Sequence, residues 1–299
     1  MRRPLPNSAV LSVDVEDYFQ VEAFSGLIDR SAWDNYTCRV EPNTARILDI
    51  LDECQSTATF FVLGWVAERY PNLVRRIVDR GHELGCHSYW HRLVYSLTPD
   101  QFQEDTTRAK NAIEQAAGVS IDGYRAPSFS ITPRSIWALD LLAQLGFRYD
   151  SSIFPVKHDV YGFPDAPRGP FRVDTPFGSL IEFPMATFRS GFGPNLPCGG
   201  GGYLRMLPFW YTKSGISKMW REGLPVVSYI HPWEIDPDQP CLASPLKSRL
   251  RHYLNLSRTE QKLRRLLALT RFTSFRDSGL VDVSPALSLR EAFEEPILG

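Results

Sequence analysis

GHELGCHSYWH, residues 81–91, places two histidines, His87 and His91, four positions apart directly after a short apolar strand. On a helix or a wide turn, side chains with this spacing share one face, so two neutral imidazoles could meet one zinc ion at about 2.0–2.1 Å each. Zinc would also need a third, anionic ligand. Two histidines on a surface turn could have the same spacing, so the meaning of the pair depends on the rest of the chain.

An alternation of strands and helices precedes this stretch. Residues 9–16, AVLSVDVE, have the pattern of a buried strand that ends in acidic residues, and the period of two places Asp14 and Glu16 on the same face. The apolar spacing then predicts, in order, a helix over about 42–54, a strand over 58–64, a helix over 66–77 and a short strand over 82–86.

The alternation continues beyond the two histidines. Thr98, Pro99 and Gln101 form a capping box with proline at the first helical position, which predicts the start of a long helix. A strand near 120–125 follows this helix and ends at Arg125. The order strand, helix, strand is therefore maintained on both sides of the histidine stretch.

Two more elements extend this pattern: a helix from Thr132 to about residue 145, and a strand, FRYD, that ends at Asp150. Repeated βα units predict a parallel sheet with both faces covered, and in barrels of this kind the functional residues lie at the carboxyl ends of strands. The residues expected at such ends are Asp14, Glu16, His87, His91, Arg125 and Asp150.

The chain between about residues 155 and 205 is rich in proline and glycine. It includes GPNLPCGGGG at 193–202, which we interpret as a surface insertion with tight turns, although consecutive glycines could also let the backbone approach a ligand closely. A helix over 205–222 and the apolar strand LPVVSYI follow. This strand delivers His231 in the sequence HPWE.

The last part of the chain contains a basic amphipathic segment over 244–267. Its arginines are expected to form a solvated outer face rather than a lipid or nucleic-acid site. Its leucines are expected to face inward: Leu246, Leu250, Leu254, Leu263 and Leu267. We therefore expect a barrel over residues 1–235, with the insertion at about 155–205, and a helical extension over 236–299 that packs on the barrel.

Composition and charge limit the classes to which this protein can belong. The 299 residues can bury a large core, and 33 lysines and arginines nearly balance 34 acidic residues, so no overall field favours nucleic acid or an anionic membrane. The 5 scattered cysteines form no C-x-x-C pair and indicate reduced thiols. Asp14 interrupts the first apolar run, which is too short for a signal peptide. These features predict a soluble, cytoplasmic enzyme.

Taken in order, six motifs resemble the polysaccharide deacetylases of carbohydrate esterase family 4, which include chitooligosaccharide and peptidoglycan deacetylases. The motifs are SVDVED, ATFFVLG, GHELGCHSYWH, YRAPSFS, RYDSS and SYIHPWE, and the resemblance covers roughly residues 8–235. WEIDPDQP and the basic segment after it are similar to a branch associated with exosortase and exopolysaccharide clusters. The resemblance implies an α/β fold, an irregular TIM-like (β/α)7 barrel, which agrees with the pattern of elements above.

The resemblance implies a role for the residues at the strand ends. Asp14 would be the general base, and Arg125 would hold it by a charge-assisted hydrogen bond. His87 and His91 would bind a divalent metal ion, with zinc the first choice.

The third metal ligand has two candidates. The first motif of the family most often has two adjacent aspartates, the second of which binds the metal, whereas this chain has D-V-E-D. Some relatives use aspartates at i and i+2, an arrangement that would make Glu16 the ligand here, and strand geometry agrees because Asp14 and Glu16 share a face. Asp17 is the alternative.

On the other side of the expected site, the resemblance makes His231 the general acid and Asp150 a residue that orients a histidine. Tyr229 stands where the family usually has leucine, two positions before the acid histidine. A tyrosine there could narrow or polarise the floor of the pocket that accepts the acetyl methyl group.

The implied function is hydrolysis of N-acetyl groups from an N-acetylated sugar in a polysaccharide, or in its lipid-linked precursor, with a zinc-activated water. The alternatives are a metal-independent cyclic-amide hydrolase similar to allantoinases and a catalytically inactive carbohydrate-binding barrel. We expect a carbohydrate partner, no nucleic acid and no transmembrane segment. A peripheral contact with a membrane-bound polysaccharide synthesis complex stays open, as do the sugar, the metal and the oligomeric state.

Overall fold

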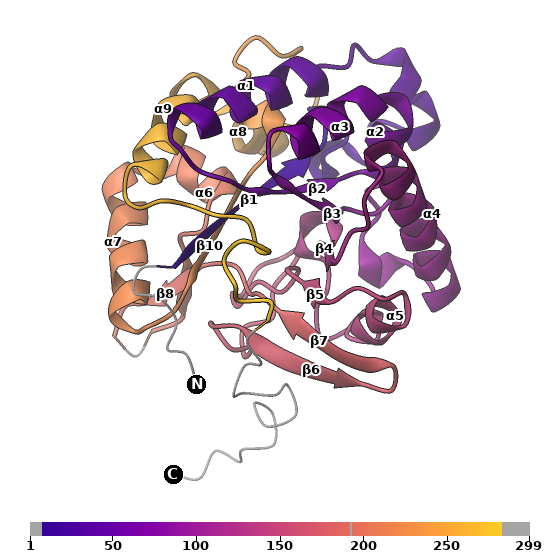
Figure 1. Ribbon diagram of the computed structural model, residues 1–299. Coiled ribbons are helices and arrows are strands. Elements are labelled where there is room, and N and C mark those ends of the chain that lie inside the picture. The colour runs from indigo at the N-terminus through magenta and orange to yellow at the C-terminus, as the bar shows by residue number, and fades with distance from the viewer. Residues whose placement is uncertain (1–7, 192, 283–299) are drawn as a thin grey trace.

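One curved sheet forms the centre of the protein, and helices lie along its outer side (Figure 1). The computed structural model describes residues 8–191 and 193–282. The strand order is β10-β1-β2-β3-β4-β5-β7-β6, and β6 and β7 form the antiparallel pair. The strands are β1 (Ala9–Val15), β2 (Thr59–Val62), β3 (Glu83–Cys86), β4 (Gly123–Tyr124), β5 (Tyr149–Asp150), β6 (Phe171–Thr175), β7 (Gly178–Glu182) and β10 (Val226–Ile230), with β8 (Thr187–Arg189) and β9 (Asn195–Pro197) in a second, small sheet.

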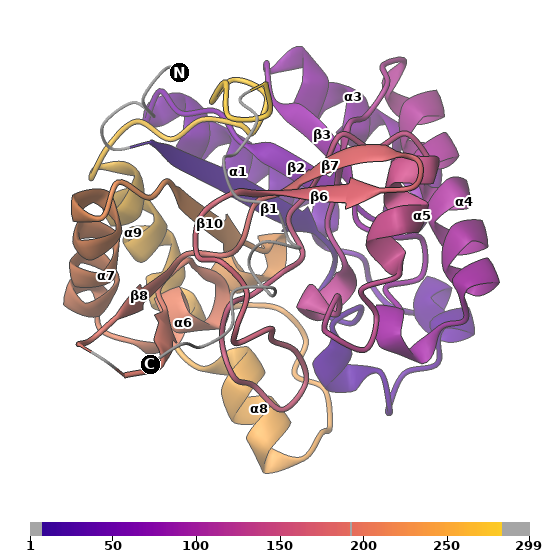
Figure 2. The ribbon, with the colours of Figure 1, turned by 90° about the horizontal axis from the view of Figure 1, so that it is seen from below.

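The sheet confirms the predicted α/β class and the irregular barrel, in the form of a curled half-barrel. β10 pairs in parallel with β1, with Ala9 opposite Val226, so the last strand of the main sheet lies next to the first. α7 flanks β10 at one end of the sheet, and α5 flanks β6 and β7 at the other (Figure 2). Because the paired strands run in parallel, the carboxyl ends of β1, β3 and β10 lie at the same edge.

Helices cover the strands in the expected alternation, but several of them differ from the prediction. The helix expected over 205–222 starts only at Phe209, because Pro208 separates it from α6, which ends at Met206. The helix expected over 66–77 is two helices, because Pro71 starts a new one and Tyr70 before it lies at φ −127°. The helix expected from Thr132 begins only at Ala138, since Ser135 Oγ bonds the Thr132 amide in a preceding turn. The helices are α1 (Val40–Glu53), α2 (Gly64–Arg69), α3 (Pro71–Asp79), α4 (Pro99–Ala117), α5 (Ala138–Gln144), α6 (Gly201–Met206), α7 (Phe209–Arg221), α8 (Leu246–Tyr253) and α9 (Leu256–Leu267).

Short 3-10 turns connect several of these elements: η1 (Glu22–Phe24), η2 (Arg30–Asn35), η3 (Val94–Ser96), η4 (Pro127–Phe129) and η5 (Pro232–Ile235). The capping box predicted for Thr98 and Gln101 is confirmed at the start of α4. β1 is buried along its whole length, which is typical of a strand covered on both faces.

The glycine-rich stretch at 199–202 packs against β10. Gly200 has a φ of 127°, and a Cβ atom there would lie 2.0 Å from the carbonyl oxygen of Tyr229. The Tyr229 amide donates to the carbonyl of Gly199 at 2.7 Å. These glycines therefore let two backbone segments approach closely, rather than forming a surface turn or approaching a ligand directly.

The basic C-terminal segment is two helices, α8 and α9, broken at Asn255, which has a φ of 62°. Leu263 and Leu267 are buried, as predicted. The prediction is wrong for the three leucines before the break, Leu246, Leu250 and Leu254, which are 72%, 53% and 43% exposed. The break ends the helical register, and α8 buries His252 instead. Residues 283–299 of the expected extension lie outside the described residues, and no helix among the described residues is long and apolar enough to cross a membrane.

Candidate metal centre and active site

Three potential metal ligands meet at the carboxyl ends of β1 and β3. One ligating atom each from Glu16, His87 and His91 lies within 4.8 Å of the other two, and all three side chains are buried. The closest approach is 2.7 Å, between His91 Nε2 and Glu16 Oε2. The histidine pair and the first strand therefore converge, as the parallel strand order requires.

The two histidines lie on an irregular loop rather than on a helix. Ser88 and His91 have φ values of 65° and 50°, which non-glycine residues seldom adopt. Arg30 stabilises the loop from η2, because its guanidinium donates to the carbonyls of Trp90 at 2.6 Å and of His91 at 3.1 Å. Such backbone strain is common at functional sites, where surrounding contacts must hold it.

His87 is held in the tautomer that a metal ligand requires. Its Nδ1 lies 2.8 Å from the carbonyl oxygen of Arg125, and this contact leaves Nε2 free for a cation. Burial lowers the pKa of His87 to about 4, so the ring is neutral at physiological pH. A neutral imidazole is the form that binds zinc.

Glu16 supplies the negative charge of the cluster. Burial opposes its ionisation, but His91, by charge and hydrogen bond, and then His231 and His87 lower its pKa to about 2. The indole Nε1 of Trp233 donates to Glu16 Oε1 at 3.2 Å. An ionised, oriented carboxylate beside two imidazoles has the chemistry of a zinc site, so these residues fit a divalent metal ion.

Asp17, the alternative acidic ligand, points elsewhere. Its carboxylate accepts hydrogen bonds from the backbone amides of Tyr18 at 2.8 Å and of Val40 at 2.8 Å, and it also accepts one from the Arg39 amide. Arg39 and Val40 start α1, so Asp17 caps that helix. Both of its oxygens are thereby occupied, and the geometry favours Glu16 as the acidic ligand.

Asp14 lies beside the cluster, held by a buried arginine. Arg125 is fully buried and its Nη1 donates to Asp14 Oδ1 at 2.9 Å and to the Ser12 hydroxyl. Its Nε donates to the carbonyl of Ser151 at 2.9 Å, which fixes the plane of the guanidinium. The second oxygen of Asp14, Oδ2, lies 3.9 Å from His231 Nε2.

His231, at the end of β10, faces both carboxylates of the first strand. Its Nε2 is 3.5 Å from Glu16 Oε1, and its Nδ1 is 3.0 Å from Glu234 Oε2. Burial opposes a charge on this ring, but the hydrogen bond and charge of Glu234, together with Glu16 and Asp14, raise its pKa to about 9. His231 is therefore protonated at neutral pH.

Asp150, predicted to orient a histidine, contacts other groups. Its Oδ1 accepts a hydrogen bond from the Ser152 hydroxyl at 2.5 Å, and the carboxyl of Glu182 also lies next to it. Burial raises the pKa of Asp150 to about 6, and burial with the charge of Asp150 raises the pKa of Glu182 well above its usual range. Two buried carboxyls this close disfavour each other's charge, and the carboxylate that bonds to a histidine is Glu234, on His231 Nδ1, rather than Asp150.

Sequence reasoning missed Glu234 and Arg205. Glu234 stands three residues after His231, and this spacing carried a signal, because an acidic residue there can bond back to the residue that starts the turn. Arg205 is 2% exposed and donates from Nε to Glu234 Oε1 at 3.0 Å. Nothing local marks Arg205, since its partner is 29 residues away.

A pocket of about 190 Å³ opens onto these groups. Its aromatic walls are Phe129, Tyr161, Tyr229 and Trp233, and the Tyr229 ring packs edge-on against Phe129 at 4.9 Å. Ser128 in the same wall has a φ of 51°. A larger hollow of about 910 Å³ lies over α2, α3 and α4, but none of these groups lines it, so the smaller pocket is the candidate active site.

Two family models match successive parts of the chain. Residues 31–149 match the family described as polysaccharide deacetylase, and residues 151–279 match one described as a domain of unknown function (DUF3473). The boundary separates the histidine pair and Arg125 from His231, Glu234 and Arg205. The pocket therefore combines residues from both matched parts.

Several deacetylases of known name are similar to part of the chain. The peptidoglycan-N-acetylglucosamine deacetylase of Bacillus cereus is 33% identical over 98 residues, which are 32% of this chain and 36% of that protein. The chitooligosaccharide deacetylase of Bradyrhizobium sp. (strain ANU 289) is 32% identical over 100 residues, 33% of this chain and 43% of that protein. The chain thus spans less than half the length of either relative.

The fold extends the similarity to nearly the whole chain. A crystal structure from Mycobacterium smegmatis, of a protein assigned to the polysaccharide deacetylases, superposes with a TM-score of 0.61 at 21% identity and covers 96% of both chains. At this identity the match concerns the fold alone. Residues 31–149 are therefore similar in sequence to polysaccharide deacetylases, and the fold resembles one of them over nearly the whole chain.

Proposed function

We propose that the protein is a metal-dependent deacetylase that removes the acetyl group from an N-acetylated sugar unit of a polysaccharide or of its lipid-linked precursor. The observation that carries this proposal is one pocket that contains three potential metal ligands, a carboxylate bonded to an arginine and a histidine bonded to a carboxylate. An exopolysaccharide is the substrate class that we put first, and this choice rests on the sequence similarity of the C-terminal segment.

We assign Glu16, His87 and His91 as the ligands of a divalent cation, with zinc the first choice. When bound, the cation would polarise the acetyl carbonyl and lower the pKa of a water molecule to about 7. Two of these side chains already have the charge state that a metal ligand needs, since His87 is neutral and Glu16 is ionised. Each is also oriented by a hydrogen bond from outside the cluster.

Asp14 is assigned as the general base. Its Oδ1 bonds to Arg125, so Oδ2 is the oxygen that remains to accept the proton of the attacking water. His231 is assigned as the general acid because Glu234 stabilises its protonated form, and it would donate a proton to the departing nitrogen. Asp14 would thus accept one proton and His231 would donate another, so that the base and acid roles belong to two neighbouring groups.

The substrate side of the proposal follows from the pocket. A space of about 190 Å³ has room for one acetamido sugar and not for a chain of sugars, so longer substrates would lie across the opening. Tyr229 and Phe129 offer an apolar wall for the acetyl methyl group. The similar proteins are named for peptidoglycan and chitooligosaccharide substrates, both of which carry N-acetylated sugars.

The test is acetate release from N-acetylglucosamine oligomers by protein loaded with zinc. We expect release by the wild type, loss of release on chelation with recovery on adding zinc, and a rate roughly 10²–10⁴-fold lower in Asp14→Asn, the range for a lost general base. Asp34→Asn, at an exposed carboxylate paired with Arg69, is the control and should keep full activity.

Two outcomes would contradict the proposal. Amide hydrolysis by protein that contains no metal would favour the allantoinase-like alternative. Oligosaccharide binding without acetate release, in protein with a full complement of zinc, would favour an inactive carbohydrate-binding barrel.

A further inference from the structure

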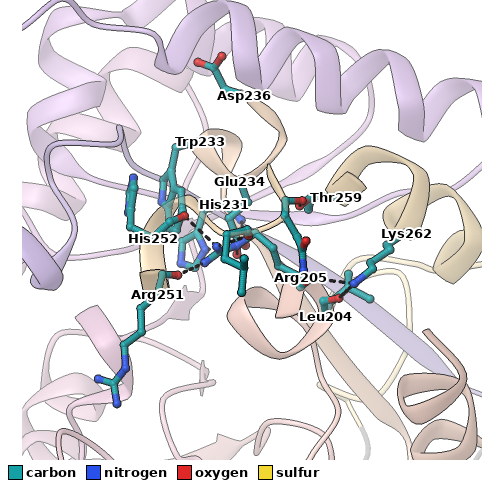
Figure 3. Close-up of polar contacts among 12 residues, drawn as sticks. Leu204, Arg205, His231, Trp233, Glu234, Asp236, Arg251, His252, Thr259 and Lys262 are labelled. Carbon is teal, nitrogen blue, oxygen red and sulfur yellow. Dashed lines mark hydrogen bonds and ion pairs between the residues drawn. The ribbon is translucent and has the colours of Figure 1, made fainter. Parts of the chain in front are cut away.

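A buried arginine connects His231 to the C-terminal helices. Arg205, in the last turn of α6, donates from Nε to Glu234 Oε1 at 3.0 Å, and Glu234 Oε2 contacts His231 Nδ1 (Figure 3). The other nitrogens of the guanidinium bind three carbonyl oxygens: Nη1 those of His252 at 2.8 Å and Leu254 at 2.9 Å, and Nη2 that of Arg251 at 2.6 Å.

These three carbonyls belong to the end of α8 and the turn before α9. Carbonyls at a helix end have no partner inside the helix and carry partial negative charge, so a guanidinium is well suited to bind them. Lys262 of α9 makes the reciprocal contact, because its Nζ donates to the carbonyls of Leu204 at 3.0 Å, Arg205 at 2.7 Å and Leu207 at 2.8 Å. α6 and the α8–α9 pair thus hold each other through two cations, the buried Arg205 and the partly buried Lys262.

We propose that Arg205 is a positioning residue that holds Glu234, and through it His231, in line with Asp14 and Glu16, so that the C-terminal helix pair keeps the acid histidine in place. This inference rests on the proposed function for its effect on rate. It gives a defined role to the part of the chain that matches a domain of unknown function, because that part supplies the acid side of the pocket and holds it there.

Arg205 restricts the orientation of the Glu234 carboxylate. Its two oxygens have different partners, Arg205 on one and His231 on the other, so the plane of the carboxylate is set. Without the guanidinium, Oε1 would be a buried acceptor with no hydrogen-bond partner, which raises the free energy of this arrangement. The carboxylate would then rotate toward another donor. His231 would then lose the contact that orients its ring.

A second contact extends the same support to the ring. His252 of α8 stacks on Trp233 with centroids 4.2 Å apart and planes at 13°, and Trp233 in turn stacks on His231 at 5.2 Å. Gln239 holds His252 by a hydrogen bond of 2.7 Å to its Nε2. The end of α8 therefore contacts the acid histidine by two routes, one through charge and one through stacked rings.

The kinetic test compares Arg205→Lys with a matched variant, Asp236→Asn. Asp236 lies two residues after Glu234, is buried and pairs with Arg39 through both of its oxygens, but it points away from His231 (Figure 3). We expect kcat to fall about 10–100-fold in Arg205→Lys, the range for a lost supporting contact, with KM within about twofold of wild type. Asp236→Asn should lower the melting temperature and keep kcat.

A readout that needs no catalysis separates this inference from the proposed function. In protein labelled with ¹⁵N-histidine, the Nδ1–H proton of His231, assigned from its absence in His231→Asn, should be protected from exchange in the wild type and in Asp236→Asn. It should exchange rapidly in Arg205→Lys. This result would stand even if no N-acetylated sugar were hydrolysed.

A variant at a less buried position keeps the test open if Arg205→Lys does not fold. Lys262→Met removes the reciprocal contact from α9, and we expect a kcat a few fold lower with the same faster exchange of the His231 proton. Unchanged proton exchange and unchanged kcat in both variants, or an equal loss in Asp236→Asn, would overturn the inference.

Discussion

The two sides of the pocket are held in place by different kinds of interaction. On the side of Glu16 and His87, short strands set the positions of the side chains, and a backbone carbonyl fixes the histidine tautomer. On the side of His231, a series of buried charged groups, Glu234 and then Arg205, sets the orientation. A group held by the backbone depends on the sheet, whereas a group held by buried charges depends on every member of the series.

Residues on the two sides of the pocket also come from the two parts of the chain that match different family models. The histidine pair and Arg125 lie in the part that matches the polysaccharide deacetylase model, and His231 with its supporting charges lies in the part that matches the second model. Trp233 is where the two sides meet, because it belongs to the second part and bonds to Glu16. Substitutions on each side should therefore have distinct signatures.

The largest effect is expected for Glu16→Gln on the metal side. The amide keeps the shape of the side chain but removes the negative charge, so bound zinc should be lost and the rate should fall roughly 10³-fold or more, since the cation supplies several kcal/mol of stabilisation. Metal analysis of the purified protein together with an acetate assay measures both effects. A variant that kept stoichiometric zinc would show that Glu16 is not a ligand.

On the acid side, His231→Asn should lower the rate roughly 10²–10⁴-fold while zinc stays bound. The loss should shrink for an acetate ester with a good leaving group, because such a group departs without a proton. Rates on an aryl acetate and on an N-acetylated sugar, measured with the same variant, check this. An equal loss on both substrates would argue that His231 acts by something other than proton donation.

At the junction of the two sides, Trp233→Phe should weaken zinc binding about 10–100-fold, the range for a lost hydrogen bond to a ligand. The ring remains, so packing against His252 changes little, and the missing group is the Nε1–H that donates to Glu16. Competition with a chelator of known affinity measures the change. Wild-type affinity would mean that the two sides are independent.

On the side of His231, the contact with Glu234 should determine how kcat depends on pH. Glu234 raises the pKa of His231 to about 9, so kcat should fall tenfold per unit as pH rises past the point where His231 loses its proton. A bound cation would lower the pKa of His231, so we predict only the direction of the change. The fall of kcat at high pH should occur at lower pH in Glu234→Gln than in wild type. Profiles of kcat for both proteins over pH 6–10 test it, and superimposable limbs would contradict it.

The raised pKa of His231 also means that protonated His231 stabilises the folded protein, and that this stabilisation decreases as pH rises. Its contribution is present in full below the usual histidine pKa of about 6.5 and is lost as pH rises through about 9.

The smallest functional effect is expected for Asp17→Asn, which tests the choice between the two acidic residues. The variant weakens the cap of α1, so the free energy of unfolding should drop by about 1–3 kcal/mol, while zinc content and kcat stay at wild-type values. Denaturant unfolding and metal analysis on the same preparation measure both. Loss of zinc without loss of stability would reverse the assignment in favour of Asp17.

Much of the fold could be predicted because the deciding signals are local. Alternation in AVLSVDVE, the capping box at Thr98 and the repeated βα order indicate where strands and helices lie, and the parallel order then brings strand ends together. The predictions were wrong where a single residue interrupted a helix that the apolar spacing predicted to be continuous. Pro71 divided one expected helix, and Asn255 divided the basic segment and left Leu250 in solvent.

The candidate site was predicted to a different degree on its two sides. Asp14, Glu16, His87, His91 and Arg125 follow from their positions at strand ends, and the structure brings them together. Asp150 also ends a strand, but its carboxyl lies beside that of Glu182, and no spacing in the sequence reveals that these two buried acids will be neighbours.

The sequence by itself determined the order of strands and helices, the spacing of the histidine pair and the face shared by Asp14 and Glu16, since each depends on neighbours within a few residues. Only the tertiary structure placed Glu16 next to the histidine pair and Asp17 at the start of α1, and only it placed Glu234 and Arg205 behind His231. The physical reason is that the orientation of a buried charge depends on the partners that surround it, and those partners come from segments far apart in the chain.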